Sequence, residues 1–484
     1  MEEISGMLKK IKNYLMPMGP EYVTAPVERM SYWSYFIGQN VFYTLVATYL
    51  STYMMSIGVD VKKSAAVMLA VKIWDAVNDP LFGVIFDKVK FKNGKCLPWL
   101  KISLFLIPAA TILMFVIPGA ATETIKLVWF AVAYLLWDTF YTFCDVPIYS
   151  MITTMTPNLD ERNAIMPIGR MMGGVGSAIT TLIFPVLSQS AGVSFGWIAI
   201  ILSLLGLLFM APICIKGKER NYNVELQEES FSLLNSFKYL ISNKYLLIYY
   251  TAYFFSSAAN TSAAVQMFVG FYLFGTANFV TIVGALGVVP AIISALLVPA
   301  LTKRCDKFKL LVWSNIVNAV LGYVMFFMGW ENATLIIILM IIRSIFANCA
   351  GMLGFMFTPD CAEYGQYKTG IDAKGITFSI QTFSAKITGA VSTSLGMFAL
   401  GLFGWIEVQA ESFEELARLN ITQPDSAMTG LWVTFMLIPS IGMTISGILY
   451  MFYKLNDKDV QIMAKCNAGE ITREEAEQQL SRKY

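Results

Sequence analysis

The chain has 484 residues, of which 56% are hydrophobic and 14% are charged, and its net charge is only +2. Soluble domains carry roughly 25% charged residues, so this composition argues against a soluble protein, and the small net charge gives no support to nucleic-acid binding. The sequence has no histidine, which removes the commonest general base and metal ligand of enzymes. We therefore expect an integral membrane protein that is not an enzyme, has no cofactor and binds no nucleic acid.

Apolar stretches long enough to cross a bilayer recur about twelve times along the chain. Backbone groups that face lipid must be satisfied within the segment, so each stretch is predicted to be an α-helix. The sequence thus predicts an all-α, multi-pass protein of the cell (cytoplasmic) membrane, embedded in the lipid bilayer. We place the spans at 31–57, 64–86, 98–118, 125–152, 164–188, 194–215, 245–275, 278–301, 309–330, 333–358, 375–404 and 429–453.

Lysine and arginine residues concentrate in the loops on one side of these spans. The loops on the opposite side carry only Lys62, Lys63, Lys126 and Arg418. The positive-inside rule places the basic loops and both termini in the cytoplasm, which requires an even number of spans. The basic loops follow spans 2, 6 and 8, with Lys88, Lys90, Lys92, Lys95, Lys216, Lys218, Arg220, Lys238, Lys244, Lys303, Arg304, Lys307 and Lys309.

A weak internal repeat divides the chain into two halves. LFGVIFDKVKFK joins spans 2 and 3, LVPALTKRCDKFK joins spans 8 and 9, and each contains an Asp-Lys pair. Two six-helix halves in the same orientation are typical of major facilitator transporters. The expected parts are a cytoplasmic lead at 1–30, an N-terminal six-helix bundle at 31–216, a cytoplasmic linker at 217–244, a C-terminal six-helix bundle at 245–454 and a cytoplasmic tail at 455–484.

The second span contains the charged sequence KIWDAVNDPLFG. A charged side chain inside the bilayer costs at least about 2.5–3.5 kcal/mol, so it is expected to have an oppositely charged partner or a functional role. Asp75 and Asp79 lie one turn apart on the same helical face, where their repulsion favours a cation between them. The amide oxygen of Asn78 completes a set suited to a hard monovalent cation. The structural alternative is a fixed ion-pair cluster with Lys72.

The fourth span, YLLWDTFYTFCDVPIYS, places Asp138, Thr142 and Asp145 on one face. Thr142 can add a hydroxyl oxygen to the cation site, and Asp145 can accept hydrogen bonds from a polyhydroxylated substrate. Tyr149 offers an aromatic face to a sugar ring, although membrane tyrosines often serve only in packing.

Three basic residues lie in later spans: Arg170 in the fifth, Arg343 in the tenth and Lys386 in the eleventh. The acids and bases of the spans are equal in number, which indicates paired charges around a wet cavity. The planar guanidinium of Arg170 can bridge Asp145 and a sugar hydroxyl. The sequence leaves open whether Asp138 and Arg343 are functional or structural.

Five segments occur in a fixed order over residues 30–455: KIWDAVNDPLFG, FYTFCDVPIYS, PIGRMMGG, DCAEYGQYKTG and SIQTFSAKITGA. Together they resemble the glycoside–pentoside–hexuronide:cation symporters of the major facilitator superfamily, typified by melibiose permease. The resemblance implies the major facilitator fold and sugar symport. It also implies that Asp75, Asn78, Asp79 and Thr142 bind the coupling cation.

The resemblance extends to residues for the sugar and for gating. It implies sugar binding by Asp145 and Arg170 in the N-terminal half and by Gln381 and Lys386 in the C-terminal half, to which we add the candidates Asn40, Lys72 and Tyr149. Asn40 replaces an acid that many sugar-binding members carry, which puts galactoside specificity in doubt and would suit an anionic uronide. Asp360, Glu363 and Tyr364 match a motif that helps to close the cytoplasmic side.

These features lead us to expect a monomeric secondary transporter that works by alternating access. Its expected cargo is a sugar, glycoside, pentoside or hexuronide. Na⁺ is the favoured coupling cation because the set of four oxygen-bearing residues is complete, and H⁺ or Li⁺ is possible because paired carboxylates titrate as a unit. Two alternatives remain: an amphiphile or lipid carrier on the same fold, and a sugar sensor that does not transport.

Overall fold

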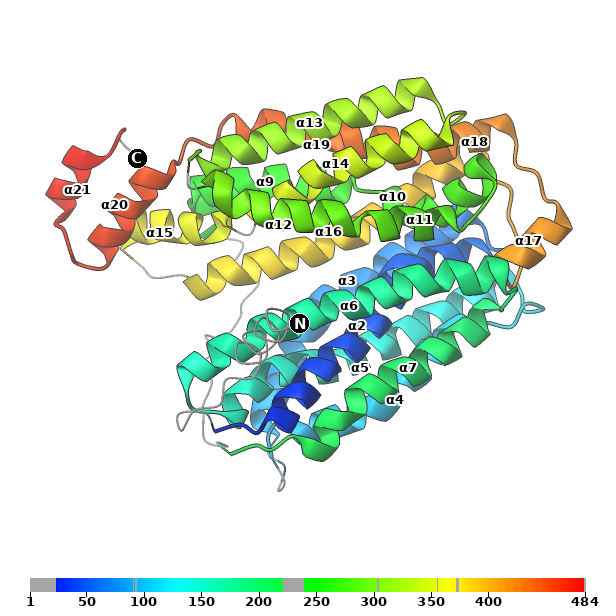
Figure 1. Ribbon diagram of the computed structural model, residues 1–484, viewed down its shortest axis with the longest axis horizontal. Helices are drawn as coiled ribbons and strands as arrows, with labels where there is room; N and C mark the ends of the chain where they lie inside the picture. Colours follow the sequence, from blue (N-terminus) through cyan, green and yellow to red (C-terminus); the bar gives the residue numbers. More distant parts are fainter. Residues whose placement is uncertain are drawn as a thin grey trace, which may run out of the picture. The chain divides into compact units, whose positions relative to one another are not determined.

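The computed structural model describes residues 23–89, 91, 94–220, 239–302, 304–354, 356–370 and 374–482. Side chains of some helical residues, including Asp79, Asp87 and Lys88, lie outside the description. The described residues are nearly all helical (Figure 1), as the sequence predicts. Contacts divide the chain into two units, which we call the N-terminal unit and the C-terminal unit.

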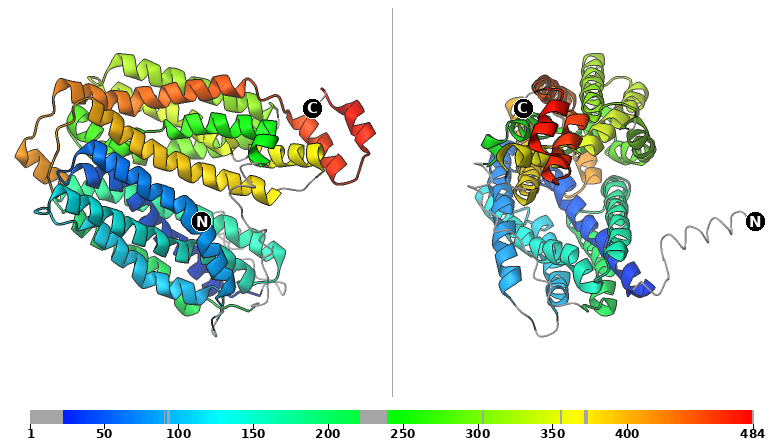
Figure 2. Two further views of the ribbon diagram at one scale, coloured as in Figure 1. Left: turned by 180° about the vertical axis from the view of Figure 1, so that it is seen from behind. Right: turned by 90° about the vertical axis from the view of Figure 1, so that its left-hand side faces the viewer.

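The N-terminal unit comprises Met1–Asp60, Val77–Gln227 and Glu407–Ile421. Within it α2 packs against α6 and α7, and α4 packs against α5 and α7. These helices run side by side in Figure 1 and in the left view of Figure 2. Close contact of α2 with α6 requires glycine at position 176, because a Cβ there would overlap the carbonyl oxygen of Ile37. The helices are α2 (Pro26–Met55), the second part of α3 (Val61–Lys88), α4 (Leu97–Phe115), α5 (Glu123–Met155), α6 (Leu159–Pro185) with the π-helix η1 (Val186–Ser190), α7 (Phe195–Lys216) and α17 (Phe413–Leu419).

Glu219, just beyond the end of α7, holds the start of α4. Its buried carboxylate accepts hydrogen bonds from the backbone N–H groups of Lys95 at 2.7 Å, Cys96 at 2.9 Å and Leu97 at 2.5 Å. These are the N–H groups that a helix leaves unsatisfied at its beginning, where a negative charge also interacts favourably with the helix dipole. One side chain thus fixes where α4 begins relative to α7.

The C-terminal unit comprises Val61–Ala76, Glu228–Ile406 and Thr422–Tyr484. Within it α9 packs against α16 and α19, and α13 packs against α14 and α19. The helices of this unit, besides the first part of α3, are α9 (Lys244–Ala258), α10 (Ser262–Phe268), the π-helix η2 (Val269–Leu273), α11 (Phe279–Leu286), α12 (Val288–Thr302), α13 (Lys307–Met328), α14 (Ala333–Gly354), α15 (Phe357–Thr369), α16 (Lys374–Leu402), α18 (Asp425–Trp432), the π-helix η3 (Val433–Leu437), α19 (Ile438–Tyr450), α20 (Asp457–Asn467) and α21 (Arg473–Gln479).

The seventh predicted span is not one continuous helix. α9 ends at Ala258 and α10 begins at Ser262. The side chains at the break bond to carbonyl groups of η3: Thr261 donates to the Thr434 oxygen at 2.5 Å, and Ser262 donates to the Phe435 oxygen at 2.8 Å. Irregular backbone at membrane depth is tolerated where it is buried in protein or lines a cavity, so this break marks a place in the C-terminal unit to look for a binding site.

Nine helices of the described residues are long and apolar enough to cross a membrane by length and composition. The three other predicted spans, 31–57, 64–86 and 245–275, coincide with α2, α3 and the interrupted run from α9 to η2. The units differ from the predicted bundles at two places, because 61–76 groups with the C-terminal unit and 407–421 with the N-terminal unit. The location of both termini in the cytoplasm stays a prediction.

Residues 407–421, which we call the strap, fold onto the N-terminal unit although most of the flanking chain belongs to the other unit. The strap pairs with the end of α2 through two backbone hydrogen bonds, and Phe413 packs edge-on against Phe195 with ring centroids 5.9 Å apart. Four hydrogen bonds donated by backbone N–H groups hold the strap: Gly58 N to Val408 O at 2.8 Å, Ala410 N to Ser56 O at 2.9 Å, Phe195 N to Glu411 O at 2.8 Å and Phe413 N to Ser188 Oγ at 3.1 Å.

Candidate functional site

A buried polar cluster joins α3 and α5 in the N-terminal unit. The amide nitrogen of Asn78 donates to the Thr142 hydroxyl at 2.8 Å and to Asp138 Oδ2 at 3.2 Å. The Thr142 hydroxyl in turn donates to the Asp138 carbonyl oxygen one turn earlier, at 3.0 Å. The structure therefore brings Asn78 and Thr142 together and adds Asp138 to them. The side chain of Asp79, the fourth predicted cation ligand on these two helices, lies outside the described residues.

Asp75 forms an ion pair with a lysine of another helix. Its Oδ1 lies 2.6 Å from the Lys386 ammonium of α16, and both side chains are partly exposed. Lys72, the base that the sequence offered as a structural partner, donates instead to the Thr393 hydroxyl at 3.0 Å. Helical spacing placed Lys72 and Asp75 on one face but could not show that a lysine of another helix reaches the carboxylate.

Asp145 in α5 is held by an amide of α2. Gln39 Nε2 donates to Asp145 Oδ1 at 2.7 Å, while the buried Oε1 of Gln39 has no hydrogen-bond partner. Arg170 in α6 is exposed, and its guanidinium carbon lies 6.0 Å from the ring centroid of Tyr149, close enough for a cation–π contact. The N-terminal unit thus presents a carboxylate, a guanidinium and an aromatic face on neighbouring helices.

Gln39 is the residue that the sequence analysis missed, since it had selected Asn40. Asn40 Nδ2 donates to the Phe36 carbonyl oxygen of its own helix at 2.9 Å and packs against Gly173 of α6. The buried side of α2 includes Tyr35, Gln39 and Phe42, which follow helical spacing. That periodicity was the signal that could have favoured Gln39 over its neighbour.

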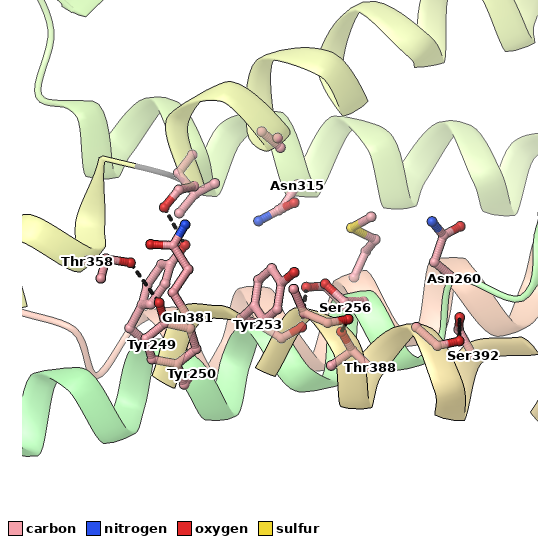
Figure 3. Close-up of a pocket in the computed structure, with 18 of the residues that line it drawn as sticks. Tyr249, Tyr250, Tyr253, Ser256, Asn260, Asn315, Thr358, Gln381, Thr388 and Ser392 are labelled. Atoms are coloured by element: carbon pink, nitrogen blue, oxygen red, sulfur yellow. Dashed lines mark hydrogen bonds between the residues drawn. The ribbon is translucent and has the colours of Figure 1, made fainter. Parts of the chain in front are cut away.

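Gln381 lines a pocket inside the C-terminal unit, shown in Figure 3. Its Oε1 is buried and has no hydrogen-bond partner. Tyr253 of α9, Asn260 at the break before α10 and Asn315 of α13 line the same pocket. Lys386, one turn further along α16 than Gln381, is not among the lining residues and is engaged with Asp75.

The three predicted gating residues tie α15 to other parts of the C-terminal unit. Asp360 forms an ion pair with Lys307 at 2.6 Å, and Lys307 also contacts Asp457 at 3.1 Å. Glu363 accepts a hydrogen bond at 2.8 Å from Asn467 of the tail helix α20, which lies beside α15 in Figure 2. Tyr364 packs edge-on against Tyr245 of α9, with centroids 4.8 Å apart. Their role in closing the cytoplasmic side stays a prediction.

Arg343 lies apart from these clusters. Its Nε donates to Asn318 Oδ1 at 2.7 Å, and its Nη1 lies 3.5 Å from the sulfur of Met436. Among the described residues no ion pair involves this arginine, so its surroundings are neutral. The arrangement joins α13, α14 and η3 and is consistent with the structural alternative for Arg343.

Long apolar helices with buried polar groups between them are typical of multi-pass membrane transporters. The sequence matches the profile of the family described as MFS/sugar transport protein over residues 31–457. Because the match covers most of the chain, the protein belongs to this family. The predicted fold class and the expected location in the membrane are confirmed.

The relatives of the chain are transporters and not enzymes. It is 24% identical over 448 residues to the uncharacterized symporter YnaJ of Bacillus subtilis (strain 168), covering 91% of this chain and 94% of that protein. It is 25% identical over 451 residues to the isoprimeverose transporter of Lactiplantibacillus pentosus, covering 90% of each. The crystal structure of the nucleoside transporter NupG has the same fold, with a TM-score of 0.61 at 12% identity over 89% of this chain and 100% of NupG.

Proposed function

We propose that the protein is a cation-coupled symporter that carries a sugar, glycoside, pentoside or hexuronide by alternating access, with Na⁺ as the favoured cation and H⁺ or Li⁺ as alternatives. The observation that carries the proposal is the buried cluster of Asn78, Asp138 and Thr142 between α3 and α5. Membership of a sugar transport family and the symporter named among the relatives support it.

The cluster has the chemistry that a hard cation requires. It contains carboxylate, hydroxyl and amide oxygens, and no sulfur or imidazole takes part in its hydrogen bonds. A half-turn of the Asn78 amide would replace its donor nitrogen with its oxygen, which a bound Na⁺ would attract. Asp79, one residue further along α3, is the second carboxylate that we assign to this site from its sequence position.

The ion pair between Asp75 and Lys386 suggests how a cation can alter the C-terminal unit. The ammonium of Lys386 supplies the positive charge that Asp75 needs inside the membrane. A diffusible cation near Asp75 would compete with that lysine, so cation binding and the position of α16 would be linked. Such coupling is reciprocal, and the substrate must tighten cation binding by the same factor.

Sugar recognition is assigned to Asp145, Arg170 and Tyr149 in the N-terminal unit. A carboxylate accepts hydrogen bonds from sugar hydroxyls, a guanidinium donates two in a fixed geometry, and the tyrosine offers a flat apolar surface. Movement of one cation down a membrane potential supplies about 2.3 kcal/mol per 100 mV. That energy would drive accumulation of the sugar.

The test is uptake of labelled glycosides, pentosides and uronides into proteoliposomes with and without a Na⁺ gradient. We expect Na⁺ to stimulate uptake by the wild type, and we expect both Asp75→Cys and Asp79→Cys to lose that stimulation while remaining folded. Asp425→Cys, at the start of α18, is the control and should keep it. Stimulation that survives in both variants would refute the cation assignment.

Two further arms of the experiment address the alternatives. Counterflow of labelled sugar across the vesicle membrane distinguishes a transporter from a sensor, because a sensor binds sugar without exchanging it. Transport of acyl-chain amphiphiles in place of every sugar would indicate a lipid carrier.

A further inference from the structure

The pocket of the C-terminal unit has a volume of about 580 Å³, within the range of about 300–1,000 Å³ typical of small-molecule sites. It is lined by residues of α9, α13, α14, α15, α16 and α19. One end lies at the break between α9 and α10, where Asn260 and Ser392 are seen in Figure 3. Binding sites of membrane transporters often lie beside such interrupted helices.

Two amide side chains of this pocket have unused hydrogen-bonding capacity. Asn315 is only 4% exposed, and Figure 3 shows its side-chain amide pointing into the pocket from α13 without a hydrogen bond to the other residues drawn. The buried Oε1 of Gln381 is likewise without a partner. Leaving a buried polar atom such as Gln381 Oε1 unpaired costs about 1–3 kcal/mol. Since the Asn315 amide points into the same pocket, the two side chains together indicate a polar ligand.

Tyrosines provide the apolar part of the pocket. The hydroxyl of Tyr249 donates to the Gly354 carbonyl oxygen at 2.6 Å, and that of Tyr250 lies 2.6 Å from the Thr358 hydroxyl. Their polar ends are therefore occupied by protein groups. Tyr253 faces Asn315 across the pocket in Figure 3. An aromatic surface opposite free amides suits a sugar ring, which has apolar C–H faces and hydroxyl groups at its edge.

The pocket carries no formal charge. None of the described residues that line it is an aspartate, glutamate, lysine or arginine. A carboxylate that entered it would lose water without gaining a basic partner, which is strongly unfavourable. A neutral sugar ring loses only hydroxyl hydration, and the unpaired amides can replace those hydrogen bonds.

We propose that this pocket, with Asn315, Gln381, Asn260 and Tyr253, binds an uncharged sugar ring of the cargo in addition to the sugar-contacting groups assigned to the N-terminal unit, so that the cargo is a neutral glycoside and not a uronide. The proposal rests on the proposed transport function and narrows its substrate class. Asn315 is assigned as a substrate-contacting residue, a role that the sequence motifs did not suggest.

The test compares Asn315→Leu with wild type for uptake of labelled isoprimeverose, lactose and D-glucuronate in the same proteoliposomes. We expect the wild type to take up a neutral disaccharide in preference to glucuronate. In Asn315→Leu the half-saturating concentration of that disaccharide should rise about tenfold, the value of one or two hydrogen bonds. Because the variant replaces a polar side chain inside the protein with an apolar one of similar size, its thermal midpoint in detergent should be equal to or above that of wild type.

Matched controls separate binding from folding. Asn332→Leu changes the same residue type at the exposed start of α14 and should leave the half-saturating concentration unchanged. Tyr253→Leu should raise it several-fold, whereas Tyr323→Leu, at a half-buried position of α13 that does not line the pocket, should not.

Three outcomes would overturn the proposal: preferred uptake of glucuronate by the wild type, an unchanged half-saturating concentration in both Asn315→Leu and Tyr253→Leu, or an Asn315→Leu protein whose only change is lower stability. Na⁺ stimulation is measured in every sample. If stimulated uptake persists while these effects are absent, only the assignment of the pocket fails. If the wild type shows no stimulation for any solute, the transport proposal itself fails.

Discussion

The charged groups of the N-terminal unit and the pocket of the C-terminal unit differ in their chemistry. The N-terminal unit concentrates charge, with Asp138 and Asp145 in α5 and Arg170 in α6. The pocket of the C-terminal unit offers amides, hydroxyls and tyrosine rings instead. A hydrogen bond to a charged group contributes about 1.5–3 kcal/mol, whereas a hydrogen bond between neutral groups contributes about 1 kcal/mol. Single substitutions should therefore cause large losses at the charged groups of the N-terminal unit and graded losses at the neutral pocket of the C-terminal unit.

The largest expected effect on uptake is at Asp145. Asp145→Asn keeps the size of the side chain and the contact with Gln39 but removes the charge that would strengthen hydrogen bonds to a sugar. We expect uptake efficiency to fall about 100-fold, which corresponds to about 2.7 kcal/mol. The measurement is initial-rate uptake over a range of sugar concentrations, with Asp425→Asn as the matched control. A loss of uptake efficiency of less than threefold would contradict the expectation that charged groups contribute more than neutral ones.

The second effect concerns stability. Glu161, in the first turn of α6 and ahead of the membrane-spanning part of that helix, pairs with the buried Arg29 at 3.4 Å and accepts hydrogen bonds from Thr24 and Thr156. Glu161→Gln removes the carboxylate charge that pairs with the buried Arg29 and should lower the free energy of unfolding by about 3 kcal/mol. Thermal unfolding of the purified protein in detergent measures this, with the exposed Glu477→Gln as control.

The same residue predicts a pH dependence. Burial opposes ionisation of Glu161, but hydrogen bonds from Thr156 and Thr24 outweigh it and hold its pKa below the ordinary value. Its contribution to stability is therefore complete above the pKa of the unfolded chain and is lost as pH falls through the lower folded pKa. The stability difference between wild type and Glu161→Gln should shrink on acidification. A difference that stays constant would show that charge is not the cause.

The third prediction decides the role of Asp138. Asp138→Asn can still accept a hydrogen bond from Asn78 but cannot give a cation its negative charge. If Asp138 is a cation ligand, the Na⁺ concentration for half-maximal uptake should rise about tenfold, or about 1.4 kcal/mol. Unchanged Na⁺ dependence combined with lower thermal stability would assign it a structural role.

The smallest effect is expected at the helix break of the C-terminal unit. Thr261→Val keeps the shape of the side chain at the break between α9 and α10 but removes the hydrogen bond to the Thr434 carbonyl oxygen. The loss should be about 1 kcal/mol, visible as a fall of a few degrees in the thermal midpoint. Thr429→Val, whose hydroxyl bonds only within α18, should change it less. Equal shifts in the two variants would contradict the proposed support of the break.

Hydrophobic patterning predicted most of the fold because each span is set by its own sequence and the bilayer. It did not predict the break at Ala259–Thr261, since the carbonyl partners of that break lie more than 170 residues away. Nor could it place the strap, whose polar sequence reads as an ordinary loop. Contacts between residues far apart in the chain produce no periodic pattern that can be recognised in a single sequence.

The site was predicted to the extent that one helix determines it. The spacing of Asp138 and Thr142 put both on one face, and the structure joins them to Asn78. The partner of Asp75 was not predictable, because spacing says nothing about which base of another helix reaches it. Asn315 was missed since an uncharged residue in an apolar span gives a weak signal.

The exchange of segments between the units has a practical consequence for dissecting the protein. A cut after Gln227 yields two fragments, and neither contains every part of its own unit. The upstream fragment lacks residues 407–421, so the face of Phe195 that contacts Phe413 would be exposed. The downstream fragment lacks 61–76, so Lys386 would lose the Asp75 carboxylate. Each half made alone should therefore be unstable, and co-expression of both fragments should restore protein that neither yields separately.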